Sequence, residues 1–232
     1  MVFHDSSILD TFGATFPNSS PLHVNFPSYT VSKKYSLISK KEINSNIITL
    51  GVFGTIRPYK NLEIVSSELG LLDELQLASL SLKLFGKAFY NIDKLVKDFE
   101  SLSLADFKYN LESITDDQFY NEMADCDFLI LPHSSSSGSA LLSVAASLGI
   151  PIIASNLTVF RDFVDRYHSG IIFDHTDAGD LSQVISSLIH DKQKRKFLKD
   201  KALGAVTLTL SWDQYVFEIS KCCEKLLTTR VR

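Results

Sequence analysis

From residue 47 onward the chain alternates short apolar segments with longer segments of helical periodicity, and this alternation restricts the fold more than any other feature. Most of these segments are rich in Ile, Leu, Val and Phe, and 105–111 has a mixed pattern. Strands of this kind are buried on both faces, which is typical of a parallel sheet covered by helices. We therefore predict an α/β fold, a Rossmann-like doubly wound parallel sheet of about six strands with C-terminal helices. The expected strands are 47–53, 80–85, 105–111, 127–131, 151–154 and 170–173.

The segments between these strands carry apolar residues at the three- and four-residue spacing of amphipathic helices. Leu62, Val65 and Leu69 show this spacing directly after the first strand. Thr115, with Gln118 three residues later, has the spacing of a capping box at a helix start. The expected helices are 61–75, 90–102, 116–124, 139–148, 159–165, 180–190, 192–203 and 212–228.

The composition changes near residue 45 and divides the chain. Residues 1–45 are rich in Ser, Asn, Pro and Lys, with short strands expected at 2–3 and 23–26. Residues 46–210 hold the regular sheet domain, and residues 211–232 form a final helix. A net charge of −4 argues against general nucleic-acid binding, so any anion-binding site must be a local cluster of cations.

The cysteines and the hydropathy pattern indicate a cytoplasmic protein. Cys126, Cys222 and Cys223 fit neither a metal site nor an even disulfide framework, which suits a reducing compartment. We expect no signal peptide, membrane span or metal site. The basic segment 192–201 leaves peripheral membrane contact open, although a solvated helix face is the simpler interpretation.

The stretch 51–61, GVFGTIRPYKN, predicts a strand, a tight loop and the start of a helix. Ligands of open α/β sheets bind outside the carboxyl ends of the strands, and a helix amino end favours an anion. Gly54 permits a close backbone approach, while Arg57 and Lys60 add positive charge. We therefore expect a phosphate ligand, held by loop cations that are exposed to solvent. The alternative is an ordinary loop with two solvated cations.

The stretch 131–155 predicts a second loop of this kind. A strand ends at Pro132, and Ser137, Gly138 and Ser139 lie at the start of a helix of small residues. Their hydroxyl and backbone N–H groups predict an anion-binding nest. The alternative is a serine-rich helix cap without a ligand. His133, beside the nest, is either a ligand contact or an ordinary loop histidine.

Both stretches resemble the GT-B glycosyltransferases of the family-4 type, also called glycosyl transferases group 1. Residues 51–61 resemble the family's G-x-I-x-P-x-K-G/N loop, and ADCDFLILPHSSSSGSALLSVAASLGIPIIAS at 124–155 resembles its second conserved block. Further resemblance continues through Gly170 and the Ser211-Trp212-Asp213 segment to about residue 227. The resemblance identifies this region as the C-terminal donor-binding domain of a GT-B fold.

The resemblance implies a nucleoside diphosphate sugar as substrate, bound without a metal or a cofactor. No catalytic residue follows from it, because the family's two glutamates fall near Ser136 and Val144. Thr55 stands where many members have arginine, so that contact is lost or passes to Arg57. The implied diphosphate contacts are Gly54, Thr55, Arg57, Lys60, Ser137, Gly138 and Ser139. The implied contacts to the donor sugar or nucleoside are His133, Lys87 and Ser136, and the alternative for Lys87 is a solvated lysine.

The resemblance implies transfer of a sugar to a glycan or lipid-linked acceptor, in envelope or capsular polysaccharide synthesis. Residues 1–45 resemble only the last piece of the family's N-terminal acceptor domain. The chain would therefore be a hexosyltransferase when an acceptor domain completes it. Two alternatives stay open: a non-catalytic donor-binding or partner subunit, completed by a separate acceptor-domain protein, and an inactive truncated fragment.

Overall fold

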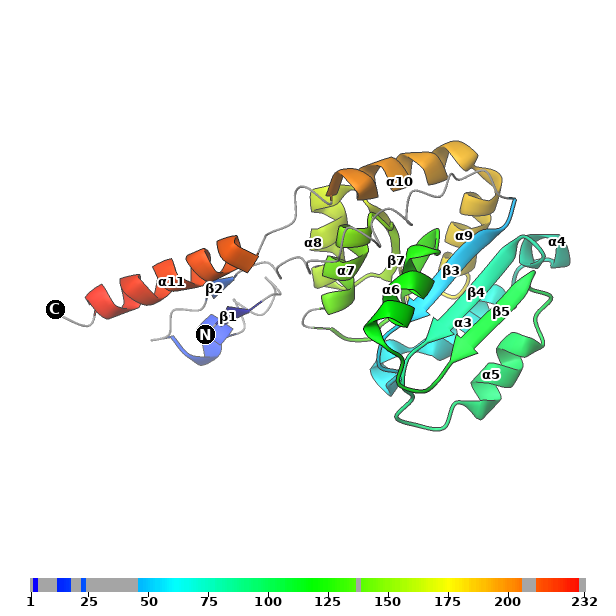
Figure 1. The fold of residues 1–232 in the computed structure, drawn as a ribbon, viewed down its shortest axis with the longest axis horizontal. Coiled ribbons are helices and arrows are strands. Elements are labelled where there is room, and N and C mark those ends of the chain that lie inside the picture. The colour runs from blue at the N-terminus through cyan, green and yellow to red at the C-terminus, as the bar shows by residue number, and fades with distance from the viewer. Residues whose placement is uncertain are drawn as a thin grey trace.

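A computed structural model describes residues 2–3, 12–17, 22–23, 46–136, 139–205 and 212–229. Its main sheet is entirely parallel, in the order β5-β4-β3-β6-β7-β8 (Figure 1). This is the Rossmann strand order, so the predicted doubly wound sheet is confirmed, with its switch point between β3 and β6. The strands are β3 (Ile48–Phe53), β4 (Leu80–Phe85), β5 (Asp106–Asn110), β6 (Phe128–Leu131), β7 (Ile152–Ser155) and β8 (Gly170–Phe173).

The helices follow the predicted order, with one correction. The expected helix 61–75 is two helices, because α3 ends before Gly70 and Asp73 starts α4 with a capping box to Gln76. The capping box predicted at Thr115 is present. The helical elements are η1 (Pro58–Lys60), α3 (Leu62–Leu69), α4 (Glu74–Leu77), α5 (Asp93–Glu100), α6 (Asp116–Ala124), α7 (Ala140–Leu148), α8 (Thr158–Tyr167), α9 (Asp180–His190), α10 (Lys192–Ala205) and α11 (Trp212–Thr229).

A separate pair of parallel strands lies in the amino-terminal part of the chain. β1 (Val2–Phe3) pairs with β2 (Leu22–His23). The expected strand at 2–3 is therefore present, and the second expected strand begins one residue early. Its residues 24–26 lie outside the described residues.

Helices cover both faces of the main sheet, and each face has its own apolar core. One core joins β3 and β4 to α3, α5 and α9, through residues such as Leu50 and Leu82. The other joins the strands to α6, α7 and α8, through Phe53, Phe85 and Leu129. Strand residues alternate between the two cores, as the period of a β-strand requires. The apolar runs in the sequence follow from this double burial.

A buried carboxylate links the two halves of the sheet domain. Glu68 on α3 is 3% exposed and accepts hydrogen bonds from the backbone nitrogens of Gly179, at 2.8 Å, and Ser182, at 3.0 Å. These are donors at the amino end of α9, where a carboxylate satisfies orphan N–H groups. Glu68 therefore fixes α9 against α3 on one face of the sheet.

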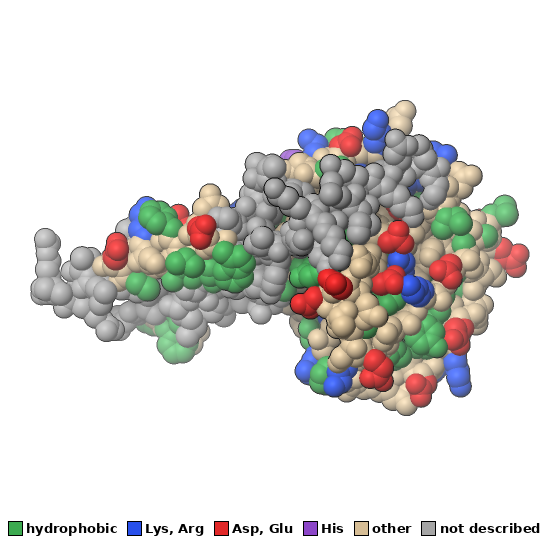
Figure 2. Space-filling model, viewed as in Figure 1, with side chains coloured by type: hydrophobic (Ala, Val, Ile, Leu, Met, Phe, Trp, Pro, Cys, Tyr) green, Lys and Arg blue, Asp and Glu red, His purple; other side chains and the backbone are tan. Residues whose placement is uncertain are grey.

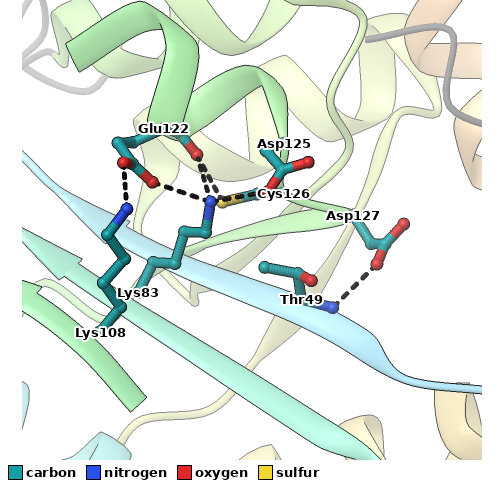
Figure 3. A network of polar contacts seen from close by, with 7 residues as sticks. All are labelled: Thr49, Lys83, Lys108, Glu122, Asp125, Cys126 and Asp127. Atoms are coloured by element: carbon teal, nitrogen blue, oxygen red, sulfur yellow. Dashed lines mark hydrogen bonds and ion pairs between the residues drawn. The ribbon is translucent and has the colours of Figure 1, made fainter. Parts of the chain in front are cut away.

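A polar network crosses the opposite face near the sheet edge (Figure 3). Lys83 of β4 forms ion pairs with Glu122, at 2.9 Å, and Asp125, at 2.8 Å, and Lys108 of β5 also pairs with Glu122. Burial lowers the pKa of Lys83, but the hydrogen bonds to Asp125 and Glu122 outweigh it and leave that pKa raised. The network ties α6 to the two outer strands.

Replacing Lys83 with methionine is expected to lower the free energy of unfolding by about 2 kcal/mol, because two carboxylates lose their buried partner. The estimate lies below the range for fully buried pairs, since the Asp125 side chain is 46% exposed. Chemical denaturation measures the change. Lys108→Met removes the same charge from a 52% exposed side chain and should cost less than about 1 kcal/mol. Equal losses in both variants would contradict this account.

Candidate functional site

The two predicted loops meet at the switch point of the sheet. Residues 54–61 follow β3, residues 132–139 follow β6, and these strands are neighbours. The Ser134 backbone nitrogen donates a hydrogen bond to the Tyr59 carbonyl oxygen at 2.8 Å, and the Ser134 hydroxyl donates to the same oxygen at 3.2 Å. The loops therefore form one edge, at the place where ligands bind in open α/β sheets.

Lys60 lies inside this edge, and the expectation of an exposed loop cation was wrong for it. Its side chain is only 6% exposed, and Nζ donates a hydrogen bond to the Phe53 carbonyl oxygen at 3.0 Å. The short 3-10 turn η1, which starts at Pro58, brings Lys60 back over the end of β3. In the described part of the chain no carboxylate forms an ion pair with this amine. Burial lowers the pKa of Lys60 to about 8.

Gly54 separates the Lys60 amine from the first turn of α7. Its φ is +89°, which is a glycine conformation, and a Cβ there would lie 3.2 Å from Lys60 Nζ and 3.5 Å from Leu141. Ser139 occupies the N-cap position of α7 and is buried, but its side chain makes no capping hydrogen bond. Ser137 and Gly138 lie outside the described residues. A buried cation and a helix amino end thus converge on Gly54.

His133 is also buried at this edge, at 3% exposure. Its ring centroid lies 5.6 Å from that of Tyr59 and 5.3 Å from that of Phe160. Neither ring nitrogen has a hydrogen-bond partner within the described structure. Burial, and then the charge of Lys60, lower the pKa of His133 to about 3. The imidazole is therefore neutral at physiological pH and has one donor and one acceptor unused.

Arg57 and Lys87 lie apart from Lys60, on the outer rim of the same edge. Both side chains are exposed. The Arg57 guanidinium lies 4.4 Å from the ring centroid of Phe89, and Lys87 Nζ lies 5.5 Å from it. Thr55 is exposed, and Ser136 is half-buried. The sequence analysis missed Phe89, whose signal is its position in the loop directly after the second strand.

The sequence that forms this edge matches a family model. The model for glycosyl transferases group 1 matches residues 34–203. The chain belongs to this family. The match includes both loops of the switch-point edge and all six strands of the main sheet. The predicted membership of the group 1 glycosyltransferases is confirmed.

Individual relatives agree with the family assignment. The chain is 24% identical over 198 residues to an uncharacterized glycosyltransferase of Methanocaldococcus jannaschii, covering 83% of this chain and 53% of that protein. Sucrose-phosphate synthase from Thermosynechococcus elongatus has a TM-score of 0.75 at 12% identity, over 98% of this chain and 58% of the synthase. Anabaena HepE in complex with UDP-glucose has a TM-score of 0.73 at 15% identity, over 97% of this chain and 63% of HepE. This chain therefore spans little more than half the length of these relatives.

Among the described residues, no helix is long and apolar enough to cross a membrane. None of their His, Cys, Asp and Glu side chains form a group of three that could hold a metal ion.

Proposed function

We propose that the switch-point edge binds the diphosphate of a nucleoside diphosphate sugar and that the chain takes part in transfer of that sugar. The buried, unneutralised amine of Lys60 beside the start of α7 carries this proposal. An isolated buried charge is energetically unfavourable. The buried amine of Lys60 is therefore expected to bind an anion that neutralises it. Gly54 leaves room for that anion next to the backbone.

The same groups account for how such a site assists transfer. When the bond between the sugar and the diphosphate breaks, negative charge grows on the leaving group. A desolvated cation and a helix amino end stabilise that charge more strongly than water-exposed groups do. His133, whose ring nitrogens are both buried without a hydrogen-bond partner in the described structure, remains a proposed contact to the donor sugar. Thr55, Ser136, Ser137, Gly138 and Ser139 remain proposed donor contacts.

We further propose the wider role that the resemblance to this family implies. The acceptor is a glycan or a lipid-linked saccharide, in cytoplasmic synthesis of envelope or capsular polysaccharide. The reaction uses no metal. Cys126, Cys222 and Cys223 are free thiols, which suits a reducing compartment.

Calorimetric titration with UDP-glucose and GDP-mannose tests the donor site. HepE, which shares the fold, was captured with UDP-glucose, and this makes UDP-glucose the first probe. We expect saturable binding of at least one donor and competition by the free nucleoside diphosphate. Absence of saturable binding for both donors and for UDP and GDP would contradict the proposal.

Donor affinity is expected to depend on pH through Lys60. Below its pKa of about 8 the amine is charged in the free protein. A bound diphosphate favours the charged amine and raises that pKa, so binding takes up a proton above about pH 8, and affinity falls there. Titration at pH 8.5 in two buffers with different ionisation enthalpies measures the uptake. The Lys60→Met variant should show none, and equal uptake in both proteins would contradict the assignment.

A second candidate is a non-catalytic subunit that a separate acceptor-domain protein completes. The apolar surface of α11 favours it, since Val216 is 56% exposed and Phe217 is 64% exposed, and Figure 2 shows hydrophobic side chains along this helix. Exposed apolar patches mark interaction surfaces. Sugar transfer by the purified chain alone would exclude this candidate.

A further inference from the structure

The rim cluster of Arg57, Lys87 and Phe89 is not explained by donor binding at Lys60. Its members come from the loops after β3 and β4, which extend the parallel ladder by one more bridge between Ile56 and Ala88. The Ile56 nitrogen donates to the Lys87 carbonyl at 2.9 Å, and the Phe89 nitrogen donates to the Ile56 carbonyl at 3.0 Å. These bonds fix the backbone of the cluster.

The ladder decides which way the side chains point. Ile56 is 1% exposed and packs with Ala88 into the core that contains α3 and α5. Since side chains alternate along extended backbone, Arg57, Lys87 and Phe89 leave on the opposite side. Phe89 is 54% exposed there, and the neighbouring Tyr59 is 41% exposed. The result is a cationic and aromatic surface beside the buried amine, not part of it.

The two cations of the rim cluster have the Phe89 ring as their shared partner. Within the described ranges, neither Arg57 nor Lys87 forms an ion pair with a carboxylate. Two like charges near one ring repel each other, and the chain around them has a net charge of −4. A local positive site on an acidic protein attracts anions that the rest of the surface repels.

We propose that the rim cluster binds an anionic group on the acceptor saccharide, either a sugar carboxylate or a sugar phosphate. The inference rests on the proposed donor site, because it needs the buried Lys60 amine to hold the donor diphosphate. The exposed cations of the rim cluster are hydrated, which suits a substrate that binds and dissociates. The desolvated amine of Lys60 suits the negative charge that develops on the leaving diphosphate. The exposed aromatic side chains of Phe89 and Tyr59 supply apolar surface for the C–H groups of a sugar ring. Arg57 supplies two parallel donors for a carboxylate or a phosphate.

Paired titrations of the whole chain test the proposal. The acidic probes are trigalacturonate and glucose 6-phosphate, and their neutral counterparts are maltotriose and glucose. We expect at least one acidic probe to bind about tenfold tighter than its counterpart, the size expected of a charge-assisted contact. The probe that does so identifies carboxylate or phosphate as the source of the anion. No preference for either acidic probe overturns the proposal.

Three variants separate this site from the donor site. The double variant Arg57→Ala/Lys87→Ala should lose the preference for the acidic probe and keep its UDP-glucose affinity within about twofold. Phe89→Leu should reduce the preference by about threefold, since the cations lose the ring that gathers them. Lys97→Ala removes one exposed charge on α5 and should change neither affinity.

The outcomes distinguish failure of the rim site from failure of the donor site. If Arg57→Ala weakens UDP-glucose binding as much as Lys60→Met does, Arg57 belongs to the diphosphate site and the proposal is overturned. If wild type prefers an acidic probe but binds no nucleotide sugar, the anion site stands alone and its assignment to an acceptor is overturned. If the double variant keeps the preference for the acidic probe, the anion binds elsewhere and the proposal is also overturned.

Discussion

Replacing Lys60 with methionine is expected to weaken UDP-glucose binding by about tenfold to a hundredfold and to raise the free energy of unfolding. The loss of affinity follows from losing a charge-assisted contact, worth roughly 1.5–3 kcal/mol. The gain in stability follows from burial. Lowering the lysine pKa from 10.5 to about 8 corresponds to roughly 3 kcal/mol of unfavourable free energy. Methionine fills a similar volume without a charge.

The net gain in stability should be about 1–2 kcal/mol, because the hydrogen bond to the Phe53 carbonyl is lost as well. The pH dependence has a definite sign. The folded state disfavours the charged amine, so the cost is fully present below pH 8 and disappears as pH rises toward 10.5. The advantage of Lys60→Met over wild type should shrink over that interval.

Calorimetric titration measures the affinity, and denaturation at several pH values measures the stability. Lys94→Met is the matched control, because this lysine is exposed on α5. It should change neither quantity beyond about 0.5 kcal/mol. An unchanged affinity in Lys60→Met would move the phosphate away from this loop. A loss of stability would mean that the buried amine has a favourable partner even without a ligand.

The fold was predictable because its signal recurs along the chain. Most strands are rich in apolar residues and end near Gly, Pro or a polar residue, and the loops are short, which is the pattern of a parallel sheet. Strand β5, with the sequence DFKYN, has a mixed pattern. The prediction of one helix at 61–75 was wrong, although the sequence there contains the signals that divide it into two helices. Gly70 ends a helix readily, and Asp73 with Gln76 has capping-box spacing.

The site was predictable only at the level of loops. The carboxyl ends of neighbouring parallel strands always share an edge, which is why the loops at 54–61 and 132–139 could be paired in advance. The direction of each side chain depends on the local turn. The 3-10 turn at Pro58 buries Lys60, and the extra bridge at Ile56 turns Arg57 outward. From charge and spacing alone, both cations were predicted to bind the diphosphate.

Replacing Gly86 with alanine is expected to lower the free energy of unfolding by at least about 3 kcal/mol and to weaken donor binding as well. Gly86 follows β4 with a φ of +147°, and a Cβ there would lie 2.1 Å from the Gly54 carbonyl oxygen. Backbone strain of this kind costs about 1–3 kcal/mol. The clash adds to it, since its partner is a backbone atom that cannot rotate away. Chemical denaturation measures the loss.

The same clash links Gly86 to the donor site through Gly54. The Gly54 nitrogen donates to the Phe85 carbonyl at 2.9 Å, and the Gly86 nitrogen donates to the Asn110 carbonyl at 2.9 Å, so neither loop can retreat without breaking a ladder bond. Moving Gly54 also moves the backbone beside the Lys60 amine. Gly204→Ala on α10 is the control, because a Cβ there meets no atom within 4 Å, and it should be neutral or stabilise by up to about 1 kcal/mol. If Gly86→Ala were as stable as that control, the close approach of the two loops would be wrong, and the placement of Gly54 in the proposed diphosphate site would be wrong with it.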